Sequence, residues 1–229
     1  MPSTLLIVAA YNEAERIAST LAALARAFPA APAWVADDGS TDRTPELARE
    51  AGARVVRSER MIGKGAAVTL AAGEALRHAA EQGGGIAGSV FVLCDGDLGE
   101  SAAQLGALAE AVRRGEGDLA VASFARRVGG GLGLAVGFAR WAIRRRCGLQ
   151  TAAPISGQRA LSGPALQDVL PFAEGFGMEV GMTIDAVRAG HRVVEVELDL
   201  SHRASGRTLA GFAHRGRQLV DFVRVYAAR

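Results

Sequence analysis

The chain has 229 residues, of which 49% are hydrophobic and 22% are charged. This length suits one large domain, or at most two small ones, with an ample core, and the composition is that of a soluble globular protein. The formal net charge is only +2, which is too small for the chain as a whole to attract a polyelectrolyte.

Arginine is concentrated in the second half of the chain. Residues 119–167 contain seven arginines and no acidic residue, and residues 203–229 contain six arginines and one acid. Such zones attract phosphates, anionic lipid or nucleic acid. Aromatic residues make up only 5% of the chain, too few for the stacking platforms that bind single-stranded nucleic acid. We therefore expect phosphate or lipid partners and no nucleic acid.

Cysteine usage and hydropathy indicate the compartment. Cys94 and Cys147 are the only cysteines, and their wide spacing does not suit a metal cage or a disulfide framework. The apolar run at residues 5–10 is too short for a signal peptide. Residues 128–139 fall short of the ~20 residues that a membrane-spanning helix needs. We expect a cytoplasmic protein that crosses no membrane but can lie on the inner face of one.

Apolar runs and helical patterns alternate regularly through residue 123. Asn12 followed by Glu15 is a capping-box pattern that predicts the start of the first helix, and Thr44 before Pro45 predicts the start of the second. This alternation is typical of an α/β fold with a mostly parallel central sheet and helices on both faces. The predicted strands are residues 5–10, 33–36, 54–57, 90–94 and 119–123, and the longest predicted helices are residues 63–81 and 101–114.

The second half of the chain is less regular. Its apolar periodicity predicts three helices and two strands. The helices are residues 134–146, 179–189 and 208–228, the first and last of them basic, and the strands are residues 155–161 and 193–200.

Two carboxylates, Asp95 and Asp97, follow directly after the predicted buried strand at residues 90–94. Residues two apart in extended backbone point the same way, so both acids can face one point beyond the strand end. That edge of an open α/β sheet is where ligands bind. Two converging carboxylates repel each other unless a cation lies between them, and oxygen ligands suit Mg²⁺ or Mn²⁺. Taken alone, this stretch is also compatible with a plain Asp-Gly turn.

Short polar side chains follow the first two predicted strands as well. The first strand ends in Tyr11-Asn12-Glu13, and the second runs into Asp37 and Asp38. At the carboxyl edge of the sheet, such carboxylates and amides can bind ribose hydroxyls and base edges. Each run taken singly is compatible with a turn, but three such clusters on one edge favour a nucleotide site.

Three further residues are candidates for a role at this edge. Lys64 is the only lysine, and it stands between two glycines at a predicted helix start, where phosphates bind; the alternative is an ordinary surface lysine. Glu179 begins a helix in an apolar stretch and can accept a proton there, or it can serve only the helix dipole. His202 follows a strand beside arginines, which suits a metal or phosphate role as well as a surface position.

The ordered set of these motifs resembles family 2 glycosyltransferases of the GT-A fold, in the branch of dolichyl-phosphate mannose synthase-like enzymes. The resemblance covers residues 4–206. It is carried by the segments AAYNE, VADDGSTD, GKG, LCDGDL, SGQRAL and GFGMEVGMTIDAVRAG.

The resemblance implies a nucleoside-diphosphate sugar as donor. It places residues 1–123 in the nucleotide-sugar-binding half and residues 124–229 in the acceptor-binding half of one GT-A domain. The nucleotide-sugar-binding residues it implies are Ala9, Tyr11, Asn12, Glu13, Asp38, Gly63, Lys64, Asp95 and Gly96. Asp95 and Asp97 would be the DXD-type acids that hold a divalent cation, and Asp97 and Glu179 the catalytic residues, with Glu179 as general base.

The chain departs from the polyprenyl-phosphate members at Gly99, where those proteins often have glutamine. The segments SFARRVGGG, GFGMEVGMTID and SHRASGR are instead similar to glucosyl-3-phosphoglycerate synthases, in which a late histidine completes the metal shell. This similarity makes His202 a metal ligand. Those longer enzymes retain the anomeric configuration and need no general base, so the role of Glu179 and the stereochemistry stay open.

We expect a metal-dependent glycosyltransferase that uses Mg²⁺ or Mn²⁺ and a UDP- or GDP-linked sugar. The acceptor is expected to be phosphorylated, such as a polyprenyl phosphate, and to be bound by Arg126, Arg159 and Arg203. The alternatives are a retaining transferase that acts on a soluble phosphorylated acid, and a non-catalytic nucleotide-sugar-binding protein. Peripheral contact with an anionic membrane and a homodimer are further expectations about partners.

Overall fold

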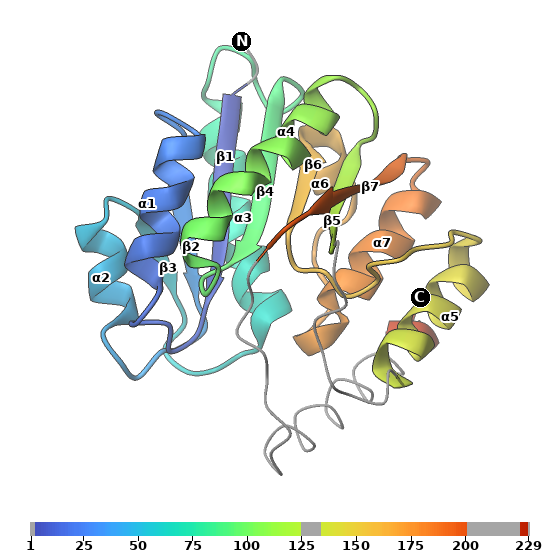
Figure 1. Ribbon diagram of the computed structural model, residues 1–229, viewed down its shortest axis with the longest axis horizontal. Coiled ribbons are helices and arrows are strands. Elements are labelled where there is room, and N and C mark those ends of the chain that lie inside the picture. The colour runs from blue at the N-terminus through green and yellow to red at the C-terminus, as the bar shows by residue number, and fades with distance from the viewer. Residues whose placement is uncertain (1–2, 125–133, 201–224, 229) are drawn as a thin grey trace.

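The computed structural model describes residues 3–124, 134–200 and 225–228. Seven strands in this part of the chain form one sheet (Figure 1). The strands are β1 (Ser3–Ala10), β2 (Ala33–Asp37), β3 (Arg54–Arg57), β4 (Ser89–Asp95), β5 (Leu119–Phe124), β6 (Arg159–Ser162) and β7 (Val193–Leu198). Their order across the sheet is β3-β2-β1-β4-β6-β5-β7.

The sheet is mostly parallel, as expected. Strands β3, β2, β1 and β4 run parallel to one another, and β7 runs parallel to β5. Only β6 is antiparallel to its neighbours, β4 and β5. The parallel half therefore brings the carboxyl ends of β1, β2 and β4 to the same edge of the sheet.

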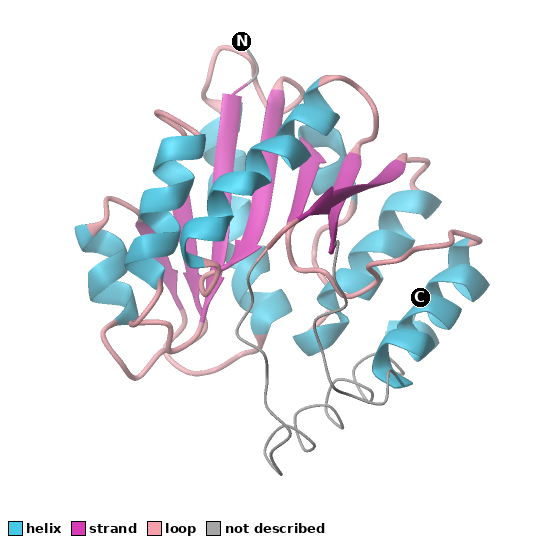
Figure 2. Ribbon diagram, viewed as in Figure 1, coloured by secondary structure: helices cyan, strands magenta, loops and turns pink. Residues whose placement is uncertain are grey.

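Helices cover both faces of the sheet (Figure 2). The α-helices are α1 (Ile17–Ala27), α2 (Thr44–Glu50), α3 (Lys64–Ala80), α4 (Gly106–Arg113), α5 (Leu134–Cys147), α6 (Gly163–Asp168) and α7 (Met178–Arg188), and two 3₁₀ segments are η1 (Gly99–Leu105) and η2 (Gly175–Gly177). Helices α1 and α4 pack on one face, and α3, α6 and α7 on the other. In the described ranges no helix is both long and apolar enough to cross a membrane.

Strand β4 shows why the sheet is buried on both faces. Its side chains alternate between the two layers, with Val92 and Cys94 facing α1 and α4, and Phe91 and Leu93 facing α3 and α7. All four residues are 3% exposed or less. A strand covered by helices on both sides must be apolar throughout, which is the pattern of this stretch.

Several predicted boundaries differ from the structure. The first helix begins at Ile17 rather than at Asn12, because Asn12 has a φ of 54° and its side-chain oxygen accepts a hydrogen bond from the Thr41 amide at 2.8 Å instead of capping a helix. The strand predicted at residues 155–161 begins only at Arg159, and α6 was not predicted. Most of the helix predicted at residues 208–228 lies outside the described residues.

Gly65 sets the distance between α3 and the segment that leads into α7. A Cβ atom on Gly65 would lie 1.9 Å from the backbone oxygen of Ala173, so the two backbones are in direct contact. Only glycine allows this approach. The contact brings the first residue of α3, Lys64, close to the first turn of α7, where Glu179 lies.

We predict that Gly65→Ala lowers the free energy of unfolding by about 1–3 kcal/mol, because the added methyl group overlaps a backbone oxygen that cannot move alone. The matched control is Gly73→Ala in the same helix, where the nearest atom to the new Cβ is a flexible Arg77 nitrogen at 3.8 Å. That control should raise stability by about 0.5–1 kcal/mol. Urea denaturation of both variants checks the prediction, and equal effects of the two substitutions would contradict it.

Candidate active site at the carboxyl edge of the sheet

The candidate site is built on the segments that follow β1, β2 and β4, residues 10–14, 37–44 and 95–97, which we call the carboxyl rim. Strand register brings them together. Ala10 pairs with Asp37 across β1 and β2, and Ala9 pairs with Asp95 across β1 and β4. The predicted convergence of the three polar clusters on one edge is therefore present in the fold.

The loops after β1 and β2 are joined by hydrogen bonds from backbone amides. The Asn12 amide donates to Ser40 Oγ at 2.9 Å, and the Glu13 amide donates to Thr44 Oγ1 at 2.8 Å. Together with the Asn12–Thr41 bond, these contacts hold the AAYNE segment against the DDGSTD segment. The loops form one ordered platform, with Tyr11 exposed on it.

Asp38 shapes the loop before α3. Its carboxylate accepts hydrogen bonds from the amides of Ile62 at 2.7 Å and Gly63 at 3.0 Å. The side chain is therefore bonded to backbone, and it holds in place the turn that presents Lys64. Asp37 is fully buried and pairs with Arg57 at 3.2 Å.

Lys64 connects two carboxylates that are far apart in the sequence. Its Nζ lies 2.6 Å from Asp95 Oδ1 and 2.8 Å from Glu179 Oε1, so α3, β4 and α7 meet at one ammonium group. Burial disfavours the charged ammonium, yet the adjacent carboxylates of Asp95 and Glu179 outweigh this effect and raise the pKa of Lys64 well above its ordinary value. Lys64 is therefore a permanent cation, and 26% of its side chain remains exposed at the rim.

Gly157 and Gln158, the two residues that precede β6, lie next to Asp95. Gln158 Nε2 donates to Asp95 Oδ2 at 2.8 Å. A Cβ atom on Gly157 would lie 2.7 Å from Asp95 Oδ2 and 2.9 Å from Lys64 Nζ, so the backbone lies directly against the ion pair. The SGQRAL segment of the sequence gives no sign of a role for Gly157 or Gln158, because nothing in the local pattern shows which residues β6 brings beside β4.

Arg159, which is expected to bind the acceptor, is buried in the core. Its side chain is 0% exposed, with Nε donating to the Ser156 backbone oxygen at 2.8 Å and Nη1 to Thr183 Oγ1 at 2.9 Å. Thr183 in turn donates to the Glu179 backbone oxygen at 3.0 Å. Burial lowers the pKa of Arg159 to about 10, which leaves it protonated at neutral pH. Arg159 therefore supports α7 from inside the core, and its expected role in binding the acceptor stays a prediction.

The donor atoms at the rim suit a hard divalent cation. Asp95 and Asp97 supply carboxylate oxygens. The contact between the Lys64 ammonium and Asp95 shows that this carboxylate is placed to bind a positive charge. Across residues 3–124, 134–200 and 225–228 no cluster of three or more histidine, cysteine, aspartate or glutamate residues is present. Mg²⁺ and Mn²⁺ sites that take one or two protein carboxylates and complete the shell with phosphate oxygens fit such a donor set. Arg126, His202 and Arg203 lie outside the described residues.

Gly96, between the two acids, is tied to the neighbouring elements. Its amide donates to the Ala9 backbone oxygen at 2.8 Å, and its own oxygen accepts from Thr20 Oγ1 at 2.7 Å. These bonds fix the backbone of the Asp-Gly-Asp turn between β1 and α1. The turn is therefore part of the folded core rather than a solvated loop.

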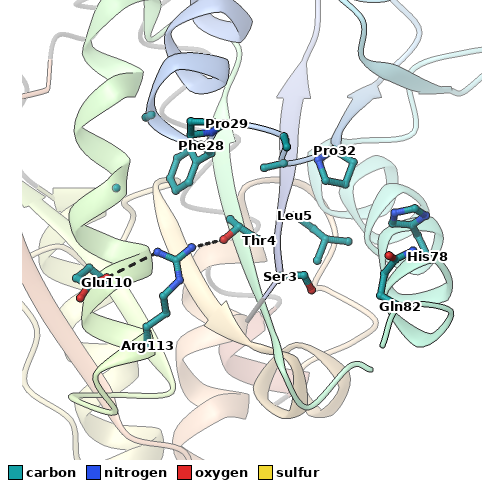
Figure 3. Close-up of a pocket in the computed structure, with 14 residues that line it drawn as sticks. Ser3, Thr4, Leu5, Phe28, Pro29, Pro32, His78, Gln82, Glu110 and Arg113 are labelled. Carbon is teal, nitrogen blue, oxygen red and sulfur yellow. Dashed lines mark hydrogen bonds and ion pairs between the residues drawn. The ribbon is translucent and has the colours of Figure 1, made fainter. Parts of the chain in front are cut away.

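A cavity of about 840 Å³ lies elsewhere, at the amino ends of the strands (Figure 3). It is lined by the first residues of β1, including Ser3 and Thr4, and by Arg113 of α4. This cavity contains none of the candidate site residues. The carboxyl rim, not this cavity, carries the charged groups that sequence analysis singled out.

Comparison with known proteins agrees with this geometry. The family described as "Glycosyl transferase family 2" matches residues 5–146. The undecaprenyl-phosphate mannosyltransferase of Micrococcus luteus is 31% identical over 241 residues, covering 96% of this chain and 92% of that protein. The dolichyl-phosphate hexose transferase of Haloferax volcanii is 45% identical over 65 residues, 28% of each chain.

Crystal structures of glucosyl-3-phosphoglycerate synthase from Mycobacterium tuberculosis show the same fold. One of them, in complex with Mn²⁺, uridine diphosphate and glucosyl-3-phosphoglycerate, superposes with a TM-score of 0.72 at 25% identity, covering 99% of this chain and 80% of that chain. The GT-A architecture expected from the motifs is confirmed. Since the family match covers more than half of the chain and a relative matches along nearly all of it, this protein belongs to glycosyl transferase family 2.

Proposed function

We propose that this glycosyltransferase moves a hexose from a UDP- or GDP-linked donor to a polyprenyl phosphate at the cytoplasmic face of a membrane. The observation that carries the proposal is the Lys64 ammonium held between Asp95 and Glu179 at the carboxyl rim. A cation and two carboxylates at this edge form a site for a charged diphosphate. The acceptor class comes from the mannosyltransferase relative, whose match covers both chains almost completely.

The chemical requirement is to stabilise a nucleoside diphosphate as it leaves the sugar. In the proposal Asp95 and Asp97 hold Mg²⁺ or Mn²⁺, which supplies charge neutralisation for the departing diphosphate. Lys64 contributes a second, permanent positive charge beside Asp95. The hydrogen-bonded loops of residues 10–14 and 37–44 receive the nucleoside, and the first turn of α7 faces the acceptor.

The role of Glu179 depends on the acceptor. A phosphate monoester loses its second proton near pH 6, so a polyprenyl phosphate attacks as an anion and needs no general base. With that acceptor we propose that Glu179, only 5% exposed, positions the Lys64 ammonium. With a hydroxyl acceptor and inversion of the anomeric configuration, the same carboxylate would serve as the expected general base.

A second candidate is transfer to a soluble phosphorylated acid. It is favoured by the overall match to glucosyl-3-phosphoglycerate synthase, one of whose structures contains phosphoglyceric acid. The discriminating experiment is a donor screen with UDP- and GDP-linked hexoses and Mg²⁺ or Mn²⁺, in which release of nucleoside diphosphate is followed. Release that requires a polyprenyl phosphate supports the first candidate, and release that requires 3-phosphoglycerate supports the second. Absence of release with every donor and acceptor would overturn the proposed transferase activity.

We predict that Asp97→Asn lowers nucleoside diphosphate release by at least about 100-fold, because the substitution removes a charged oxygen ligand without changing side-chain size. The matched control, Asp168→Asn, removes an exposed carboxylate that pairs with His191 far from the rim and should leave the rate unchanged. Steady-state kinetics on both variants, with circular dichroism to confirm folding, provides the measurement. A wild-type rate for Asp97→Asn would refute the assignment of this residue.

We also predict that Gly157→Ala lowers turnover by about 10- to 100-fold, because the new methyl group would push apart Asp95 and Lys64. The nearby control Gly148→Ala has no atom within 4 Å of the new Cβ, although its φ of 77° adds local strain, and it should retain turnover. Turnover numbers at saturating donor and acceptor test the difference. Loss of activity in Gly148→Ala but not in Gly157→Ala would contradict the packing argument.

A further inference from the structure

One exposed helix face combines arginine with tryptophan. In α5 the residues Arg140, Trp141, Arg144 and Arg145 are all exposed, and we call this group the α5 face. Trp141, Arg144 and Arg145 follow Arg140 by one, four and five residues, which puts the four side chains on adjoining sides of the helix. No acidic residue occurs between positions 119 and 167, so the helix itself carries no counter-charge. Within the described residues neither Arg144 nor Arg145 forms an ion pair.

The tryptophan of this face is held firmly although it is 50% exposed. Its ring lies 4.8 Å from the Tyr226 ring and 5.4 Å from the Phe138 ring, measured between centroids. The Arg146 guanidinium lies 4.3 Å from the centroid of the same Tyr226 ring. Aromatic contacts on one side thus fix Trp141 while its other side remains open to solvent.

The α5 face is anchored to the body of the protein. Ala139 and Ile143, on the opposite side of α5, pack with Val180 and Ile184 of α7 and with Val225 near the chain end. Figure 1 shows α5 and the chain end together at the outer edge of the molecule, with α7 between α5 and the sheet. The first turn of α7 carries Glu179, so one helix layer connects the α5 face to the carboxyl rim.

We propose that the α5 face is a docking surface for an anionic lipid bilayer. Arginines attract acidic headgroups, and a half-exposed tryptophan fixed beside them is suited to the boundary between headgroups and acyl chains. The aromatic rings contact one another rather than standing apart, so they offer no row of platforms for successive nucleotide bases. An anionic membrane is therefore the partner that both the charge and the tryptophan favour.

The docking surface also has a consequence for sugar transfer, and that consequence rests on the proposed function. A polyprenyl phosphate presents its phosphate at the bilayer surface. Binding through the α5 face would bring α7, and with it the carboxyl rim, close to that surface. Docking itself depends only on lipid charge and on the named side chains, so it can be tested without any sugar transfer.

The test measures sedimentation of the full-length protein with phosphatidylcholine vesicles, with or without phosphatidylglycerol. We expect the protein to bind only the anionic vesicles, to dissociate at high salt, and to lose at least about tenfold in affinity in the double variant Arg144→Glu, Arg145→Glu. Trp141→Ser should weaken binding as well. The control Arg49→Glu, Arg77→Glu makes the same change in net charge on α2 and α3 and should bind like the wild type.

Fluorescence gives a second, independent measurement. Trp34 is 2% exposed, so a blue shift of the emission upon addition of anionic vesicles reports on Trp141, the other tryptophan. Equal vesicle binding by wild type and the α5 double variant, or no preference for anionic lipid, would overturn the proposal. So would equally tight binding to a single-stranded oligonucleotide that is lost in the same variant.

Failure of docking and failure of the proposed transferase are separable. With polyprenyl phosphate dissolved in detergent, the Arg144→Glu, Arg145→Glu variant should release nucleoside diphosphate at the wild-type rate. If the wild type itself shows no release but binds anionic vesicles, the transferase proposal fails and the docking surface stands. If release occurs but vesicle binding does not, the docking surface alone is rejected.

Discussion

The structure depends on one electrostatic contact at the carboxyl rim, the partly exposed Lys64 ammonium between the carboxylates of Asp95 and Glu179. Removing either carboxylate would leave the Lys64 ammonium with one anionic partner instead of two, so the three groups act as a unit. They come from a helix start, a strand end and a second helix. The contact therefore fixes how α3 and α7, two helices of the same layer, meet the sheet at its carboxyl rim.

The neighbouring backbone is shaped around this contact. Gly65 lets α3 touch the segment before α7, Gly157 leaves room beside Asp95, and Asp38 holds the turn that carries Lys64. None of these three residues is required by secondary structure alone. Together they hold the charged groups of Lys64, Asp95 and Glu179 close to one another. An enzyme that stabilises a departing diphosphate needs charged groups that are already in place before the reaction.

Local patterns were sufficient to predict the strands, the long α3 helix and the acids at the strand ends, because apolar runs and helix starts depend on near neighbours in sequence. They failed where a side chain's partner is distant. Asn12 resembles a helix cap but bonds to the loop after β2, and nothing in the sequence around Arg159 shows that its side chain is buried. Trp141 contacts Tyr226 across most of the second half of the sequence, and the low aromatic content of the chain did not indicate this contact.

The central claim is that a nucleoside diphosphate binds at the carboxyl rim through a divalent cation on Asp95 and Asp97. Calorimetric titration with UDP and GDP, in Mn²⁺ and in excess chelator, tests it most directly when wild type and Asp95→Asn are compared. The account predicts binding to the wild type that requires Mn²⁺ and that Asp95→Asn largely abolishes. Equal nucleotide affinity in chelator and in Mn²⁺, for both proteins, would contradict it.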